Sequence, residues 1–473
     1  MNHEYKTSIT ILPDDVMLDI FDFIRIANIS LGPHYDYAWG WKRLALVCRR
    51  WRQLIFASPL RLCLQLRCQR RVYRVTPFCT PLSRWPASFP IAIDFHDGLA
   101  ERLDEDNAIA ALKHPNRVCL LAILASPFRM EKLATIIREP FPALTKLQLS
   151  LGYSDSPVLL NRFLPVGGAP CLQELHLDAV SFNNLPEFIH EAPNLVTLHL
   201  KRMLESHWVP PAGMALCLSS LTKLRSLFFG FETYTPLQVP DRLTRQAPAI
   251  RAVLPALTSI RFDYVCSYVE DLVSQIDCPR LSNIYLRYLH DQDGSFVNVQ
   301  DSQIFNFINR SEDPCLTLFN EVIVDVDFSA IHLKFCHESH VPIFFQFEDC
   351  FRGAFHIVQV FSQLSAKLSN VRHFSIDSCE QFQGLEISRT DWVHILRSFT
   401  SLQTLFLSPG NVKYLAPALD EETTLLPALD LLCFENAPAN FGAKFCEDRR
   451  LSDRPVTFVR NQLEFERQIS SRT

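Results

Sequence analysis

The chain has 473 residues, of which 48% are hydrophobic and 21% are charged, and its formal net charge is −5. This composition excludes disorder over most of the length and indicates a large buried core. The near-neutral charge balance gives no general attraction to nucleic acid or to an anionic membrane, so we expect neither as a partner. The length fits roughly three globular units, or one long repeat domain with a small module.

No sequence signal indicates secretion or membrane insertion. The first residues, MNHEYKTSIT, lack the apolar segment of a signal peptide, and no stretch approaches about 18 uninterrupted apolar residues. The 15 cysteines are odd in number, form no CxxC pair and mostly lie in apolar segments. Free thiols of this kind are typical of a reducing compartment. We therefore expect a cytoplasmic or nuclear protein.

Residues 1–60 are predicted to form a helical module. Leu12-Pro13-Asp14-Asp15 favours a helix start, because proline suits the first helical position and carboxylates suit the first turn. Gly32-Pro33 breaks the connector that follows. A second helix is then predicted, with one apolar stripe formed by Trp41, Leu44, Val47, Cys48, Trp51, Leu54 and Ile55. Its solvated face is formed by Lys42, Arg43, Arg49, Arg50 and Arg52.

Two short helices cannot bury this much apolar surface against each other, since a unit below about 70 residues rarely stabilises itself. The excess apolar face must contact the rest of the chain or another protein. The module is therefore either a helical hairpin packed on its own domain or a docking surface for a partner.

The spacing of these residues resembles an F-box. The matching segments are Leu12-Pro13, Ile20-Phe21-Asp22-Phe23-Ile24, Leu44, Val47-Cys48-Arg49, Trp51-Arg52, Leu54 and Ser58-Pro59. F-box motifs bind the Skp-type adaptor of cullin–RING ubiquitin ligases through such apolar positions. The resemblance thus implies an adaptor-binding site formed by Leu12, Pro13, Ile20, Phe21, Leu44, Val47, Cys48 and Trp51. The aromatic connector from Gly32 to Trp41 is longer than a compact F-box loop, but it is similar to that of a large fungal F-box family.

Residues 61–116 are predicted to be a linker with the first strands of the next domain, since RLCLQLRC and FPIAIDFH alternate as strands do. This segment also holds a cluster of arginines, formed by Arg61, Arg67, Arg70, Arg71 and Arg74, with Phe78 and Trp85 nearby. Arginine suits phosphate, so a nucleic-acid surface is one interpretation. We favour a solvated segment, because the net negative chain lacks a wider basic stripe.

Residues 117–440 carry an internal repeat of the form Φ-x-x-Φ-x-Φ, where Φ is apolar. Its apolar positions are 118/121/123, 144/147/149, 172/175/177, 195/198/200, 224/227/229, 257/260/262, 281/284/286, 371/374/376, 402/405/407 and 429/432/434. Regular neighbours start 23 to 28 residues apart, which is the period of leucine-rich repeats. Helix-like segments lie between the repeats, so one strand and one helix per repeat would stack into a continuous core.

The predicted fold is therefore α/β: an N-terminal helical F-box followed by an irregular leucine-rich-repeat-like solenoid of short strands and helices. Residues 441–473 are predicted to be a C-terminal cap and tail. No asparagine ladder ties the repeats together, and residues 300–370 follow no clean register. NEVIVDVDFSAIHLKF and VPIFFQFED are predicted there as a strand-rich insertion.

No motif for catalysis or for a cofactor is found, and the chain has only 13 glycines with no phosphate-binding loop pattern. His332, Cys336, His337 and His340 do not have the spacing of a zinc site. Asp325 and Asp327 share one face of a predicted strand, where an exposed strand edge is favoured over an acid/base pair. We expect no enzyme activity, no catalytic residue, no cofactor and no metal.

These observations favour the substrate-recognition subunit of an SCF-type cullin–RING ubiquitin ligase. The F-box would bind the Skp-type adaptor, and through it cullin, while the repeat domain would bind a substrate protein that the sequence does not identify. The alternative is a non-ligase leucine-rich-repeat interaction scaffold, in which the N-terminal helices form a cap.

Overall fold

The structure is a computed structural model, which describes residues 12–29, 40–58, 66–68, 89–97, 102–152, 156–160, 163–203, 209–231, 251–288, 302–311, 316, 318–327, 329–338, 340–348, 350–378, 385–422, 424–435 and 443–470. The chain forms two compact units, Met1–Leu195 (unit 1) and Val196–Thr473 (unit 2). The module boundaries at residues 60, 116 and 440 stay predictions, because one compact unit can hold several sequence modules. Within the described residues, no helix has both the length and the apolar character needed to cross a bilayer.

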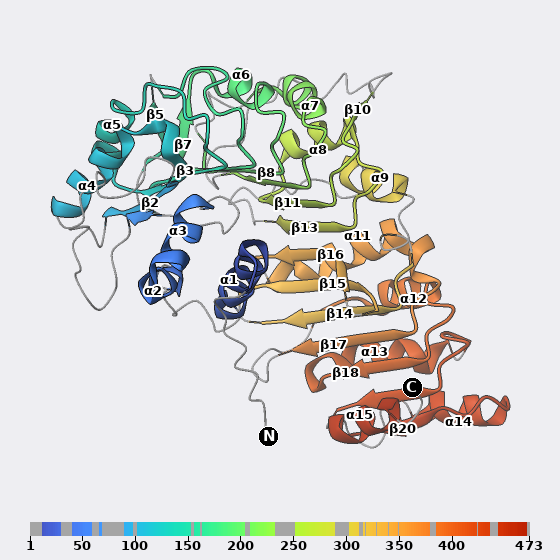
Figure 1. The fold of residues 1–473 in the computed structure, drawn as a ribbon. Helices are drawn as coiled ribbons and strands as arrows, with labels where there is room; N and C mark the ends of the chain where they lie inside the picture. The colour runs from blue at the N-terminus through green and yellow to red at the C-terminus, as the bar shows by residue number, and fades with distance from the viewer. Residues whose placement is uncertain are drawn as a thin grey trace, which may run out of the picture. The chain divides into compact units, whose positions relative to one another are not determined.

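Unit 1 places three helices before a parallel sheet (Figure 1). Its helices are α1 (Asp14–Ile29), α2 (Gly40–Val47), α3 (Arg49–Ala57), α4 (Arg102–Leu112), α5 (Pro127–Ala134) and α6 (Leu185–His190). The sheet has the order β1-β2-β3-β4-β6, with bounds Leu66–Cys68, Ile91–His96, Val118–Leu124, Lys146–Ser150 and Glu174–Asp178. A short 3₁₀ turn, η4 (Pro115–Arg117), precedes β3, and β5 (Val158–Leu160) pairs separately with β7 (Val180–Phe182).

Unit 2 contains a sheet with the order β8-β9-β11-β13-β16-β15-β14-β17-β18-β19-β20 (Figure 1). In chain order these strands are β8 (Thr197–Lys201), β9 (Ser226–Gly230), β11 (Ser259–Asp263), β13 (Asn283–Tyr288), β14 (Glu321–Val326), β15 (Ile331–His337), β16 (His340–Phe347), β17 (His373–Ser378), β18 (Thr404–Leu407), β19 (Leu431–Phe434) and β20 (Thr457–Val459). The helices are α7 (Pro211–Ser219), α8 (Ser267–Ser274), α9 (Gln303–Arg310), α11 (Cys350–Leu368), α12 (Arg389–Arg397), α13 (Pro409–Glu421), α14 (Ala443–Leu451) and α15 (Gln462–Ser470). β10 (Ala252–Val253) and β12 (Ile276–Asp277) pair beside them.

The repeated apolar positions form the core, as their alternation predicts. Every position of the ten Φ-x-x-Φ-x-Φ triplets is at most 3% exposed. In unit 2 these side chains point to the face of the sheet on which the helices pack: Phe361 of α11 contacts both Phe335 and Phe374 edge-on. We call this the inner face and the opposite one the open face. Alternate residues of each strand line the open face, since side chains of a strand alternate between its two sides.

The predicted strand-rich insertion is present as β14, β15 and β16. Here β14–β15 and β15–β16 pair antiparallel within an otherwise parallel sheet, and β16 rather than β14 pairs with β13. Asp325 lies on β14 and is ion-paired with Lys334 of β15. Asp327 follows the end of β14 and accepts hydrogen bonds from Ser329 and Ala330 in the turn. The two carboxylates are thus used in an ion pair and a turn, and β14 is an interior strand, not an edge.

The helix predicted from Trp41 to Ile55 is two helices, so that prediction was wrong. The break is at Cys48, whose backbone is extended (φ −156°, ψ 172°). Its Sγ accepts a hydrogen bond from the backbone N–H of Trp51 at 3.5 Å and caps α3. The single apolar stripe is therefore interrupted, and Val47 and Ile55 have different environments. The connector with Gly32-Pro33, and the side chains of Ile24, Trp41, Lys42 and Arg43, lie outside the described residues.

A buried carboxylate connects two neighbouring helices of unit 2. Glu270 of α8 is 1% exposed and accepts hydrogen bonds from Ser302 Oγ (2.6 Å) and from the backbone N–H groups of Gln303 and Ile304 at the start of α9. Free N–H groups at a helix N-terminus need acceptors, and a negative charge there suits the helix dipole. Glu270 thereby fixes the start of α9 against α8.

We expect Glu270→Ala to lower the free energy of unfolding of unit 2 by about 3 kcal/mol, because it leaves buried N–H donors without their charged acceptor. Glu270→Gln keeps one acceptor oxygen and should lose less. Urea denaturation measures both changes. Glu421→Ala, which removes only a surface ion pair with Arg389, should change stability by less than about 0.5 kcal/mol. An equal loss in the Glu270 and Glu421 variants would contradict the capping role.

Candidate functional site

The N-terminal helices have a small core of their own. Its buried members come from α1, α2, α3 and the position two residues before β2: Met17, Leu18, Phe21, Ala45, Ile55 and Phe89. Phe21 packs against Trp51 with ring centroids 4.9 Å apart. Phe56 meets Phe89 edge-on at 5.5 Å, and Phe89 is fully buried. The helices therefore pack on Phe89, just before β2, a contact that the cap interpretation requires.

Two of the arginines predicted to be solvated hold these helices together. Arg50 Nη2 of α3 donates to Asp14 Oδ1 (2.6 Å) and to the carbonyl of Leu12 (2.5 Å) at the start of α1. Arg52 Nε donates to the carbonyl of Ala45 in α2 at 2.9 Å. Arg49 and Arg52 are exposed, as predicted for the solvated face, and Arg50 is half-buried.

Several large apolar side chains of the module are left exposed after this core is formed. Val16 is 38% exposed, Phe23 71%, Leu46 75% and Val47 58%. Val16, Ile20 and Phe23 recur at intervals of four and three on α1, so they share a helix face. That face differs from the one carrying Met17 and Phe21, which are buried. α1 thus has a stripe that forms the core and a second stripe on which Ile20 is partly buried while Val16 and Phe23 are left for a further contact.

The structure separates the eight residues predicted to bind an adaptor. Pro13 and Val47 are exposed, while Leu12, Ile20, Leu44 and Trp51 are partly buried against the core. Cys48 is half-buried and caps α3. Phe21 is 2% exposed and supports the fold of the module. The sequence analysis did not select Val16, Phe23 and Leu46, although the second apolar spacing on α1 could have indicated the first two.

The open face of unit 2 carries a continuous row of aromatic and cationic side chains. Backbone registers place His199 opposite Phe228, Phe228 opposite Arg261, and Arg261 opposite Tyr285. The same row continues through Phe344 to Lys334. We call His199, Phe228, Arg261, Tyr285, Phe344 and Lys334 the aromatic–cationic row. Its members come from six strands, and the sequence analysis did not select it.

Arg261 is held at the centre of this row. Its guanidinium lies over the rings of Phe228 (5.0 Å) and Tyr285 (4.2 Å). Its Nε and Nη2 donate to the two carboxylate oxygens of Asp263 at 2.9 and 3.3 Å. The Arg261 side chain is 45% exposed but that of Asp263 only 2%. Ring contacts and a bidentate carboxylate fix the orientation of an arginine, whose charge here faces solvent.

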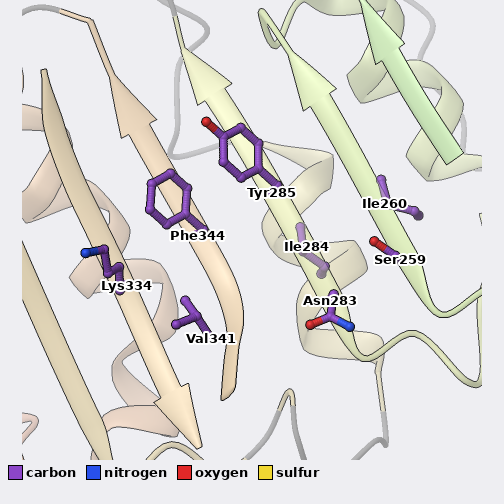
Figure 2. Close-up of a pocket in the computed structure, with 8 residues that line it drawn as sticks. All are labelled: Ser259, Ile260, Asn283, Ile284, Tyr285, Lys334, Val341 and Phe344. Atoms are coloured by element: carbon purple, nitrogen blue, oxygen red, sulfur yellow. The ribbon is translucent and has the colours of Figure 1, made fainter. Parts of the chain in front are cut away.

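A hollow of about 310 Å³ lies beside Tyr285, the residue that stacks against Arg261 (Figure 2). Its walls include Tyr285, Phe344 and Val341, with Lys334, Asn283 and Ser259 at its polar rim. Figure 2 shows the rings of Tyr285 and Phe344 side by side on neighbouring strands. They stack with centroids 4.7 Å apart, and Tyr285 Oη donates to Gln346 Oε1 at 2.5 Å. This volume is near the lower limit of ligand pockets, which are about 300–1,000 Å³, and suits one or two side chains.

Beyond Lys334, the character of the open face changes. β14 and β17 present Glu321, Asp325 and Asp377, with Asp325 directly opposite Asp377. Farther along, the open face is apolar and is covered by α15, because Phe406, Leu431, Cys433 and Val459 form a cluster with Phe465. The open face thus has three parts: the aromatic–cationic row, an acidic part, and a C-terminal part that the chain itself covers.

His373 on β17 makes part of this region sensitive to pH. Its Nδ1 lies 2.8 Å from Thr404 Oγ1, and burial lowers the pKa of the imidazole below its ordinary 6.5. Below pH 6.5 the unfolded chain binds a proton that the folded chain binds only at lower pH, so stability falls as the pH decreases. We expect His373→Gln to reduce the loss of stability between pH 7.5 and 5.5, measured by urea denaturation at both pH values. An unchanged loss would contradict this role.

Among the described residues, neither a metal site nor an activated cysteine nucleophile is found. No group of three or more His, Cys, Asp or Glu that could hold a metal is found within the described residues. The cysteines whose side chains the structure describes are free thiols, of which Cys171 is exposed. Burial raises the pKa of Cys266 and of Cys336 to about 11, so both stay protonated at neutral pH, unlike an activated nucleophile.

The arginine cluster considered for phosphate is largely outside the described residues, which exclude Arg61, Arg70, Arg71 and Arg74 together with Phe78 and Trp85. Arg67 lies on the short strand β1. The nucleic-acid interpretation of this segment therefore stays a prediction that the structure does not address.

Comparison with known proteins agrees with the N-terminal geometry. Residues 9–62 match the protein family described as F-box-like. This range contains α1, α2 and α3, and it confirms the F-box resemblance of that part of the chain. No curated protein matches the chain. The likeness of the remaining residues to leucine-rich repeats and to a fungal F-box family stays a prediction.

Proposed function

We propose that this protein is the substrate-recognition subunit of an SCF-type cullin–RING ubiquitin ligase. Its F-box-like helices would bind the Skp-type adaptor, and through it cullin, while unit 2 would bind a substrate protein. The chain itself would supply no catalytic group. Its contribution to the reaction would be proximity, because it holds a substrate lysine near the charged conjugating enzyme.

The observation that supports this proposal most is the apolar surface of the N-terminal helices. This surface stays exposed although the helices already have a core of their own. Phe23, Leu46 and Val47 are more than half exposed although Phe21 and Trp51 pack closely beside them. Large exposed apolar side chains on a small module indicate a protein contact. The F-box-like match of the same residues supports a Skp-type adaptor as that partner. A standard interface buries roughly 1,600 Å² in total, and this face with Pro13 and Leu12 would supply part of it.

The structure of unit 2 supports the proposed binding of a substrate protein. Its strand–helix units repeat with buried apolar triplets, which supports the proposed leucine-rich-repeat-like solenoid. Such a stack leaves one sheet face free of helices, and here that face carries the aromatic–cationic row. Aromatic and arginine side chains are enriched where protein partners bind.

A second candidate function is favoured by a specific contact. The burial of Phe89 between the N-terminal helices and β2 is what an intramolecular cap would produce. In that case the chain would be a non-ligase interaction scaffold, and the exposed face of α1 would bind no adaptor.

One experiment separates the two candidates. The full chain is expressed together with a Skp-type adaptor, and the complex is isolated by size-exclusion chromatography. The receptor function requires a 1:1 complex that survives dilution to micromolar concentration. If both proteins are folded but elute separately at tens of micromolar, the scaffold function is favoured and the receptor function is wrong.

A further inference from the structure

We infer that the aromatic–cationic row of unit 2 binds an extended peptide segment of the substrate that carries an Asp or Glu side chain near a large apolar side chain. This inference rests on the proposed function, because a receptor needs a partner at this face. It adds the chemical class of that partner. The carboxylate would bind Arg261, and the apolar side chain would enter the hollow beside Tyr285 and Phe344.

The free donors of Arg261 point to a carboxylate. A guanidinium has five N–H donors arranged as two forks. Asp263 occupies the side-on fork, formed by Nε and Nη2. In the part of the chain that the structure describes, no acceptor is recorded for Nη1. The end-on fork, formed by Nη1 and the second N–H of Nη2, is thus available for a second carboxylate in the bidentate geometry that arginine prefers.

The distribution of charge on the open face favours an acidic segment at this place. The carboxylates beside the row are covered by their arginines: Asp263 by Arg261 and Arg287, and Glu348 by Arg287. At the centre of the row the exposed charge is the guanidinium of Arg261, because the Asp263 side chain is only 2% exposed. Lys334, at the far side of Phe344, is ion-paired with Asp325, so it adds no unpaired charge. The acidic residues of β14 and β17 begin next to Lys334, so repulsion would confine an acidic segment to β9, β11, β13 and β16.

The distance between Arg261 and Phe344 determines how many residues separate the acidic and the apolar side chain of the bound segment. Arg261 and Phe344 lie on β11 and β16, with β13 between them. Neighbouring strands are about 4.8 Å apart, so the two positions are about 10 Å apart across the sheet. An extended chain rises about 3.3 Å per residue and covers this distance in about three residues. The segment thus has the form acid-x-x-apolar or its reverse, lying across the strands.

A random library of twelve-residue peptides displayed on phage tests the inference on the full chain. We expect selected peptides to contain Asp or Glu two to four residues from Phe, Tyr, Trp, Leu or Met. A synthetic copy of a selected peptide should lose at least tenfold in affinity when its acidic residue is changed to the amide. Selection of no peptide, or of peptides whose affinity does not depend on the carboxylate, would overturn the inference.

Three variants locate the binding. Arg261→Lys keeps a positive charge beside the buried Asp263 but cannot offer a second fork, and it should bind the peptide at least tenfold more weakly. Phe344→Ser removes the stacked ring from the hollow and should weaken binding by a similar factor. Arg397→Gln, on α12 at the helix-covered side, is the control and should bind normally. Thermal melting of each variant shows whether it is folded. Normal binding by folded Arg261→Lys and Phe344→Ser would overturn the inference.

The same preparations separate this inference from the proposed function. Adaptor binding by the full chain, with no acid-dependent peptide selected, leaves the receptor function standing and overturns the acidic segment. Peptide binding that depends on Arg261, with no adaptor binding, supports the recognition face and counts against the ligase function.

Discussion

Phe23→Asp combined with Leu46→Asp is expected to weaken binding of the Skp-type adaptor by about 100-fold or more. Truncation of an interface hot spot costs about 2 kcal/mol or more, and about 1.4 kcal/mol corresponds to a tenfold change in affinity. A charge placed on an apolar contact adds a desolvation cost. Both side chains are more than 70% exposed, so the free protein should keep its stability. Biolayer interferometry with immobilised adaptor measures the change, and thermal melting checks the fold.

Matched controls come from unit 2. Phe355 is 60% exposed and Leu451 is 73% exposed, so Phe355→Asp with Leu451→Asp introduces the same change on equally exposed positions. This control should bind the adaptor as the unchanged chain does. If the control variant loses the same affinity for the adaptor, the loss is a general effect of the added negative charges. If the Phe23 and Leu46 variant binds normally, the exposed stripe of α1 and the end of α2 is not the adaptor site.

The residues predicted from the F-box resemblance give a graded test of the same surface. Val47→Asp should weaken adaptor binding without lowering the melting temperature, because Val47 is exposed. Phe21→Ala and Trp51→Ala should lower the melting temperature, because the two rings pack on each other in the module core. A loss of binding in those two variants therefore cannot by itself identify a contact with the adaptor.

Trp392→Ala is expected to lower the free energy of unfolding of unit 2 by about 3–5 kcal/mol, the cost of removing a fully buried aromatic side chain. Trp392 lies on α12 and is fully buried. Its indole Nε1–H has no acceptor among the described residues. Trp392→Phe removes this unpaired donor while keeping an aromatic ring, so the loss of packing is partly offset and should be about 1.5 kcal/mol or less.

Urea denaturation of the two Trp392 variants measures this difference. His394→Ala, at an exposed position of the same helix, is the control and should stay within about 0.5 kcal/mol of the unchanged chain. If the Phe and Ala variants lose the same free energy of unfolding, the indole N–H is paired in solution. The volume of the cavity then does not determine the loss of stability.

The buried side of the strands and helices was predictable, because buried apolar residues recur at a regular spacing in the sequence. Each Φ-x-Φ pair marked a strand, and the segments between pairs formed helices such as α6, α8, α9 and α12. The break at Cys48 was not predictable, since residues on both sides of it favour a helix. A local contact, the bond from the Trp51 N–H to Cys48 Sγ, decided it. The N-terminal module was identified through matched spacing, and its family assignment was confirmed.

The exposed surfaces were harder to predict, because the same apolar residue type can form a core or a contact face. Phe21 and Phe23 are two positions apart on α1, yet one is 2% exposed and the other 71%. Sequence spacing placed both in one motif, and only the packing of α2, α3 and Phe89 assigned their roles. The aromatic–cationic row left no pattern at all in the sequence, because its members are single residues of separate strands.

By itself, the sequence determined that this chain has an F-box-like helical start and a long succession of strand–helix units with a common buried side. Each unit must bury the same side, so apolar residues recur at a fixed spacing. This spacing is visible in a single sequence. Only the tertiary structure decided which residues meet on the opposite side. β16 pairs with β13 although β14 and β15 lie between them in the sequence, and this places Phe344 on one side of Tyr285 and Arg261 on the other. Such neighbours depend on the order of strands in space, which spacing along the chain does not encode.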